Sequence, residues 1–169
     1  MFDTTIAAIS TALAPGAISI VRVSGEDAIS IVQSIFNKDI TKAKSYTMHY
    51  GYIIDENKQP VDEVLVSIFR APKTYTREDI VEINCHGGVY ITRKILTMVL
   101  SHGAQMAKPG EFTQRAFYHG RIDLSQAEAV EDMIEATNDT ASNMAIQGIR
   151  GSVAELIKPL IEDLLNIIA

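Results

Sequence analysis

The chain has 169 residues, with 15 Lys and Arg against 21 Asp and Glu, and 47% of the residues are hydrophobic. This length suits one domain, alone or with a helical extension, and the composition excludes a disordered tail, a collagen-like repeat and a disulfide scaffold. The single cysteine, Cys85, cannot form an internal disulfide, which indicates a reducing compartment. The net charge of −6 argues against sequence-independent binding of polyanions, because such binding needs many Lys and Arg side chains.

Neither a membrane span nor an export signal is visible in the sequence. Charged residues interrupt every apolar stretch before the roughly 18 to 20 residues that a spanning helix needs. Residues 1–5 lack the basic and apolar regions of a signal peptide. We therefore expect a cytoplasmic protein without a membrane partner.

The first 119 residues predict an α+β domain, because alternating apolar positions are typical of strands and apolar residues spaced three or four apart of helices. Ser24 is the expected N-cap of a helix that ends near Phe36, with Glu26 and Asp27 in its first turn. Residues 71–77 are an expected loop. The predicted strands span residues 4–10, 17–24, 46–54, 61–69, 79–85 and 105–107, and two further helices span residues 87–100 and 111–119.

Residues 120–169 predict only helices and are expected to begin a separate all-α domain. A capping box is expected at Ser125-x-x-Glu128, ahead of a helical apolar pattern that continues to Ala141. The last helix is expected from 156 to 168, with Pro159 at a kink or at its start. Its pattern continues to the last residue without a stop signal, so we expect a fragment of a longer protein.

Three kinds of catalytic or metal site find little support. Cys85 and His86 are neighbours on a strand and point to opposite sides, so we favour a buried core cysteine over a catalytic one. The four histidines lack the paired spacing of a metal site. No GxxxxGK[ST] loop occurs, so this chain alone is not expected to hydrolyse a nucleoside triphosphate. We therefore assign no catalytic residue and no metal ligand.

Two polar stretches leave alternatives open. In residues 74–88, Glu82 is either a solvent-face side chain, which periodicity favours, or a carboxylate aimed at a ligand. Gly87 and Gly88 are either a tight strand-to-helix turn, which we favour, or an anion site at the helix start. In residues 108–124, Arg115 and Arg121 either bind an anionic ligand or pair with Asp123 or Glu128.

These stretches carry a family resemblance that covers essentially the whole chain. The matching motifs are Asp3-Thr4-x-Ile6-Ala7, Gly16 to Gly25, Tyr75 to Gly88, Lys108-Pro109-Gly110-Glu111-Phe112-Thr113-x-Arg115-Ala116-Phe117 and Asp123-Leu124-x-Gln126-Ala127-Glu128-Ala129-Val130. Together they resemble the amino-terminal part of tRNA-modification GTPases of the MnmE (TrmE) type.

The resemblance implies a fold and a binding site. Residues 1–119 would form a mixed-sheet, folate-binding and dimerisation domain similar to that of the glycine-cleavage T protein, and residues 120–169 would begin a helical domain. The implied contacts to 5-formyltetrahydrofolate, or a related one-carbon tetrahydrofolate, are Arg22, Glu82 and Arg121. Some members have Lys at the last position, and Arg keeps the charge but changes the donor geometry. GTP, Mg²⁺ and K⁺ would bind only in a GTPase domain beyond residue 169.

The resemblance also implies a reaction and partners. With an FAD-dependent protein of the MnmG (GidA) type, the family adds an aminomethyl derivative at C5 of the wobble uridine (position 34) of certain tRNAs, using a one-carbon folate. The parent would be a homodimer through its amino-terminal domain, and tRNA would bind only the full complex. Two alternatives stay open: a stand-alone folate-dependent aminomethyltransferase, and a non-catalytic dimerisation module.

Overall fold

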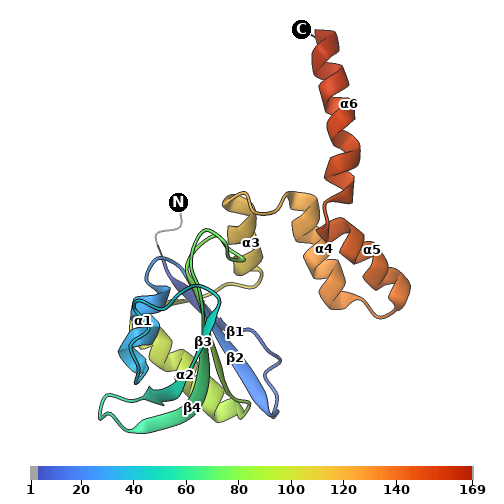
Figure 1. Cartoon of the computed structure of the whole chain (residues 1–169). Helices are drawn as coiled ribbons and strands as arrows, with labels where there is room; N and C mark the ends of the chain where they lie inside the picture. Colours follow the sequence, from blue (N-terminus) through green and yellow to red (C-terminus); the bar gives the residue numbers. More distant parts are fainter. Residues whose placement is uncertain (1–3, 169) are drawn as a thin grey trace. The chain divides into compact units, whose positions relative to one another are not determined.

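The computed structural model describes residues 4–168, including all of their side chains except those of 152–156 and 162. Contacts within the backbone divide the chain into two compact units, Met1–Arg115 and Ala116–Ala169. Each unit is described by itself below (Figure 1).

The first unit contains a six-stranded sheet with strand order β3-β4-β5-β2-β1-β6. All neighbouring strands are antiparallel except β1 and β6, which are parallel. This mixed sheet with its helices confirms the predicted α+β class. The elements are β1 (Ile6–Ile9), β2 (Ile18–Ser24), α1 (Ala28–Ile35), β3 (Thr47–Ile54), β4 (Pro60–Phe69), β5 (Ile80–His86), α2 (Val89–Ser101), β6 (Gln105–Met106) and the beginning of α3 (Glu111–Tyr118).

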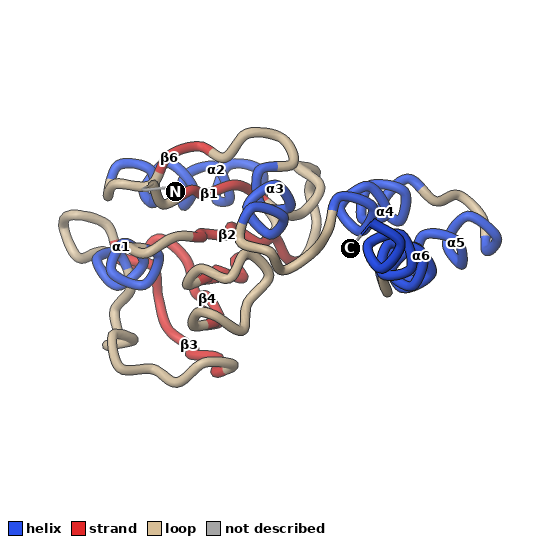
Figure 2. Tube along the Cα trace, turned by 90° about the horizontal axis from the view of Figure 1, so that it is seen from above, coloured by secondary structure: helices blue, strands red, loops and turns tan. Residues whose placement is uncertain are grey.

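One face of the sheet forms the hydrophobic core with α1 and α2. Side chains alternate between the two faces of a strand, so each strand sends every second residue toward the helices. Figure 2 shows α1 beside the red strands. The core side chains of the sheet are mostly β-branched and include Ala7, Val21, Val23, Val64, Val66, Ile68, Val81, Ile83 and Cys85, and those of the helices include Ile31, Val32, Ile35, Ile95, Leu96 and Val99.

The same alternation places polar and exposed residues on the opposite face, which we call the open face. Arg22 on β2 pairs in register with Glu82 on β5, and Glu82 in turn pairs with Ser67 on β4. Toward the β3 edge, Tyr50 and Leu65 lie opposite each other and are 50% and 40% exposed. The open face therefore has a polar centre and an apolar, exposed edge.

The beginning of α1 differs from the prediction. The helix starts at Ala28, and Asp27 is its N-cap residue, so the prediction of Ser24 as N-cap was wrong. Ser24 is the fully buried last residue of β2. Its hydroxyl lies 2.7 Å from Thr76 Oγ1 and donates to Glu78 Oε2 at 2.7 Å. The Ser24 hydroxyl, which the local pattern assigned to the helix start, therefore binds the carboxylate of Glu78 in the loop before β5.

The second unit confirms the predicted all-helical character but corrects three details. It contains α4 (Leu124–Glu135), α5 (Asp139–Ile149) and α6 (Ser152–Ile168). The capping box is formed by Asp123 and Gln126, because each side chain accepts from the other's backbone N–H; Ser125-x-x-Glu128 was the wrong pair. The predicted continuous pattern breaks where Asn138 caps α5. Pro159 lies inside α6, which begins seven residues earlier than Pro159, at Ser152.

The remaining elements follow the predictions within a few residues. Residues 55–59 join β3 and β4, residues 71–77 form the expected loop, and Gly103 follows α2 with a φ of 113°. Among residues 4–168, no helix combines the length and apolar character needed to cross a bilayer. The likeness to the glycine-cleavage T protein stays a prediction.

Candidate functional site

Arg22 and Glu82 form a partly buried ion pair at the centre of the open face. Arg22 Nε donates to Glu82 Oε1 at 2.9 Å, and Arg22 Nη2 lies 2.7 Å from the same oxygen. Their side chains are 29% and 20% exposed. Within the described residues, Glu82 Oε2 and Arg22 Nη1 make no hydrogen bond or ion pair. The pair therefore keeps one acceptor and one donor available for a bound molecule.

Two aromatic rings flank the Arg22 guanidinium. Its central carbon lies 6.0 Å from the ring centroid of Tyr75 and 5.5 Å from that of Phe112, within the range of a cation–π contact. Tyr75 belongs to the loop before β5, and Phe112 belongs to the first turn of α3. The Tyr75 hydroxyl is 2.9 Å from Thr113 Oγ1, which links the loop to the helix.

A fully buried arginine lies three residues after Phe112 on α3. Arg115 is 0% exposed and forms ion pairs with Glu78 at 2.9 Å and Glu111 at 3.1 Å. It also donates to the Thr4 carbonyl oxygen at 2.7 Å. The structural interpretation of Arg115 is therefore confirmed, but its expected partners, Asp123 and Glu128, were wrong. Spacing along the chain suggested Asp123 and Glu128, whereas the folded chain brings Glu78 against Arg115.

Glu111 is held in its ionised form by its neighbours. Burial alone would raise the pKa of its carboxyl group. The backbone N–H of Lys108 donates to Glu111 Oε2 at 2.8 Å and the Arg115 guanidinium donates to Oε1, and together they lower the pKa below its ordinary value. Arg115 thus lies between two carboxylates, of Glu78 and Glu111.

The third predicted site residue, Arg121, belongs to the second unit. It follows α3, and its backbone N–H donates to the Ala116 carbonyl oxygen at 2.9 Å. The structure thus brings Arg22 and Glu82 into direct contact. Participation of Arg121 in the same site stays a prediction.

Gly87 and Cys85 both contribute to the fold: Gly87 through its backbone hydrogen bonds and Cys85 through its burial. The Gly87 N–H donates to the Ala17 carbonyl oxygen at 3.2 Å, and the Gly87 carbonyl oxygen accepts from the Gly16 N–H at 3.0 Å. Both backbone groups of Gly87 are thus bonded to the segment before β2, and residues 87–88 form the short strand-to-helix connection favoured from the sequence. Cys85 is 3% exposed within the core, and its burial raises the thiol pKa, which confirms the core prediction.

The sequence did not reveal Tyr75, Phe112 and Glu78 as neighbours of the predicted site. All three lie in the two polar stretches singled out above, and this was the only signal available. Their contacts join residues 37 and 54 positions apart, as in Glu78 with Arg115 and Ser24 with Glu78. Pattern within one segment carries no information on such pairs.

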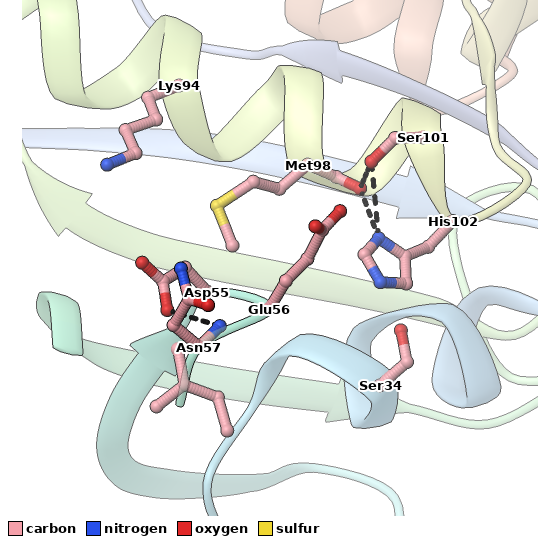
Figure 3. Close-up of a pocket in the computed structure, with 9 residues that line it drawn as sticks. Ser34, Asp55, Glu56, Asn57, Lys94, Met98, Ser101 and His102 are labelled. Carbon is pink, nitrogen blue, oxygen red and sulfur yellow. Dashed lines mark hydrogen bonds between the residues drawn. The ribbon is translucent and has the colours of Figure 1, made fainter. Parts of the chain in front are cut away.

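A separate cavity of about 290 Å³ lies on the helix-covered side of the sheet (Figure 3). Its polar groups are mostly used locally: Ser101 Oγ donates to the Met98 carbonyl oxygen, and His102 Nδ1 lies 2.8 Å from the same atom. Across residues 4–168, no three His, Cys, Asp or Glu side chains converge as a metal site requires. The lining residues are Ser34, Ile54, Asp55, Glu56, Asn57, Lys94, Met98, Ser101 and His102.

The fold is an α+β domain with a mixed sheet, and the Arg22–Glu82 ion pair lies on the open face of that sheet. Residues 5–121 match the family model described as GTP-binding protein TrmE N-terminus, and the chain belongs to this family. It is 58% identical to the tRNA modification GTPase MnmE of Bacillus cytotoxicus over 99% of its length, and 56% identical to that of Bacillus thuringiensis over the same share. The MnmE of Enterococcus faecalis is 53% identical, again over 99% of the chain. The chain spans 37% of the length of these relatives.

Proposed function

We propose that this chain is the folate-binding and dimerising amino-terminal part of a tRNA-modifying GTPase. The observation that carries the proposal is the Arg22–Glu82 pair, which keeps an acceptor and a donor available on the open face of a domain of the TrmE amino-terminal family. The bound group is 5-formyltetrahydrofolate or a related one-carbon tetrahydrofolate. When bound, it supplies the one-carbon unit.

The chemistry of the pair fits such a ligand. A pterin edge presents an amino group and a ring N–H side by side, and a carboxylate oxygen that no other donor occupies can accept from this edge. Glu82 Oε1 already accepts from Arg22, which fixes the carboxylate, and Oε2 has remaining capacity. Arg22 donates to a formyl oxygen or to the carboxylates of the glutamate tail. For Arg121, the family motif alone suggests a contact to an anionic group of the ligand.

Calorimetric titration with 5-formyltetrahydrofolate tests the role of Glu82. We expect Glu82→Gln to weaken binding about 10- to 100-fold, because a hydrogen bond to a charged group contributes about 1.5–3 kcal/mol. The matched control is Glu26→Gln, which changes an exposed carboxylate after β2 and leaves binding unchanged. Equal affinity of Glu82→Gln and the wild type would show that the pterin-edge role is wrong.

The homodimer uses the apolar part of the open face. Ile18 is 67% exposed, Met48 60%, Tyr50 50% and Leu65 40%, and a cavity of about 280 Å³ lies among Ile18, Tyr50 and Leu65. Exposed apolar side chains that gather on one face are typical of an interface. A second copy of the chain is the partner that the family relationship suggests.

Sedimentation at several concentrations tests the dimer. We expect Leu65→Glu to shift the population toward monomers, because a buried carboxylate would face an apolar partner surface. Leu13→Glu is the matched control, since Leu13 is 44% exposed in the loop before β2. A wild-type chain that stays monomeric at every concentration would contradict the homodimer.

The activity belongs to the longer protein. Relatives bear the name tRNA modification GTPase MnmE, and the 169 residues contain no GxxxxGK[ST] loop. GTP, Mg²⁺ and K⁺ therefore bind in a further domain, and this chain by itself releases no phosphate from GTP. With an FAD-dependent MnmG-type partner in the cytoplasm, the longer protein adds an aminomethyl derivative at C5 of uridine 34 of its tRNAs. A phosphate-release assay on the chain and on the full-length protein tests whether only the full-length protein hydrolyses GTP.

The same titration separates the alternatives. A non-catalytic dimerisation module would dimerise without binding folate. A stand-alone aminomethyltransferase would transfer a one-carbon unit from folate without the GTPase part. Folate binding combined with no transfer by the chain alone supports the proposed function.

A further inference from the structure

Tyr75 and Phe112 together form what we call the aromatic clamp of Arg22. The two rings come from separate segments, the loop before β5 and the first turn of α3. Neither segment is part of the sheet that carries Arg22. Something must therefore hold the loop and the helix at a fixed distance from β2, because the cation–π contacts at 6.0 and 5.5 Å depend on that distance.

A continuous chain of buried contacts supplies this connection. Arg115 on α3 pairs with Glu78 of the loop at 2.9 Å, and the other oxygen of Glu78 accepts from Ser24 Oγ at 2.7 Å. Ser24 lies two residues after Arg22 on β2. Glu78 therefore links helix, loop and strand at one point, and its side chain is only 11% exposed.

The two carboxylates at this point depend on the Arg115 cation. Glu78 and Glu111 both lie within 3.1 Å of its guanidinium, and each is 11% exposed. Without the cation, two poorly solvated negative charges would repel each other. The loop would then separate from α3, and Tyr75 and Phe112 would leave Arg22.

We propose that Arg115 is a positioning residue for the folate site: through Glu78 and α3 it holds the aromatic clamp against Arg22 and so fixes the orientation of the Arg22–Glu82 pair. The proposal rests on the proposed function of this site. The Arg115 side chain is itself 0% exposed, so it acts through its neighbours and not by direct contact with a bound molecule. The fork of its guanidinium reaches Glu78, Glu111 and Thr4 together, a geometry that a lysine ammonium cannot reproduce.

A fluorescent reporter tests the positioning without any ligand. The chain contains no tryptophan, so Phe112→Trp introduces a single reporter into the clamp. Adding Arg115→Lys to this reporter is expected to shift the emission to longer wavelength and to raise quenching by acrylamide. Arg93→Lys is the matched control, because Arg93 is exposed on α2, and it should leave both values unchanged. Unchanged emission and quenching with Arg115→Lys would overturn the proposal.

Titration without the reporter tests the consequence for binding. We expect Arg115→Lys to weaken 5-formyltetrahydrofolate binding about tenfold, corresponding to the loss of one charge-assisted contact in the site. Thr113→Val removes only the Tyr75–Thr113 contact of 2.9 Å, preserves the ion pairs and should weaken binding less. A purely structural role for Arg115 would lower the unfolding midpoint while leaving the dissociation constant unchanged, and this result would also overturn the proposal.

The two experiments fail in different ways. If the wild-type chain binds no folate, the proposed function fails, and the tryptophan reporter still decides whether Arg115 positions the clamp. If the wild type binds folate and Arg115→Lys changes neither affinity nor the reporter, only the positioning role fails.

Discussion

Replacing Gly87 with alanine probes the closest backbone approach at the end of β5. A Cβ at this position would lie 2.5 Å from the Gly16 carbonyl oxygen and 2.7 Å from its carbonyl carbon. Both atoms belong to backbone, so no side-chain rotation relieves the overlap. Separation of the segments would lengthen the hydrogen bonds that join Gly87 to Gly16 and Ala17, at 3.0 and 3.2 Å.

The expected loss of stability follows from the two possible results of the substitution, steric overlap or lengthened hydrogen bonds. Overpacking in a close contact costs about 1–3 kcal/mol, and loss of two hydrogen bonds costs a similar amount, at about 0.5–1.5 kcal/mol each. We therefore expect Gly87→Ala to lower the free energy of unfolding by about 2 kcal/mol. With a urea dependence of about 2 kcal/mol per molar, the midpoint falls by about 1 M, which circular dichroism measures.

The neighbouring glycine provides the matched control. A Cβ at Gly88 would meet only the Ile91 Cγ2 atom, at 3.3 Å, and its φ of −76° suits alanine. We expect Gly88→Ala to cost less than Gly87→Ala, about 1 kcal/mol or less, because its only loss is that alanine is a poorer N-cap than glycine for α2. Equal losses in both variants, or a larger loss in Gly88→Ala, would refute the reasoning from close approach.

Three further predictions concern other parts of the chain. Asp123→Ala should destabilise α4 by about 1 kcal/mol, because it removes the N-cap acceptor of the Gln126 N–H, whereas Asp123→Asn should lose much less; thermal unfolding of both measures the difference. Burial raises the pKa of Glu111, but hydrogen bonds and the Arg115 charge outweigh this effect and lower it. The ionised carboxylate should therefore stabilise the fold at pH values above its ordinary pKa, and this stabilisation should be lost as the pH falls through the lowered pKa. Glu111→Gln should show a weaker dependence of the unfolding midpoint on acid pH. Cys85 should react with a thiol reagent only after addition of denaturant, and rapid reaction of the folded chain would contradict its burial.

Element types were predictable because each depends on a pattern within one segment. Residues 80–86 alternate between core and open face, and this period of two predicted β5 and placed Val81 and Ile83 inside. The short α1 was also predicted, but its start was not. Ser24 has the chemistry of an N-cap, and only its contact with Glu78 shows that the hydroxyl is used elsewhere.

The candidate site was predictable to a smaller degree. The family motifs indicated Arg22 and Glu82, and the register between β2 and β5 places them opposite each other. For Arg115, the sequence predicted a possible structural ion pair, but the predicted partners, Asp123 and Glu128, were wrong. One actual partner, Glu111, lies four residues earlier on the same helix, a spacing that the sequence offers. The other, Glu78, precedes Arg115 by 37 positions, and no periodicity spans that separation.

The sequence by itself determined the α+β class, the helical character after residue 120 and the absence of a phosphate-binding loop, because local patterning and motifs depend on residue types close together in the chain. Only the tertiary structure decided which charges meet. Pairing of β2 with β5 joined Arg22 to Glu82, and docking of α3 on the loop before β5 enclosed Arg115 between two carboxylates. These contacts depend on strand register and helix docking, which are set by burial of the whole core and not by any single segment.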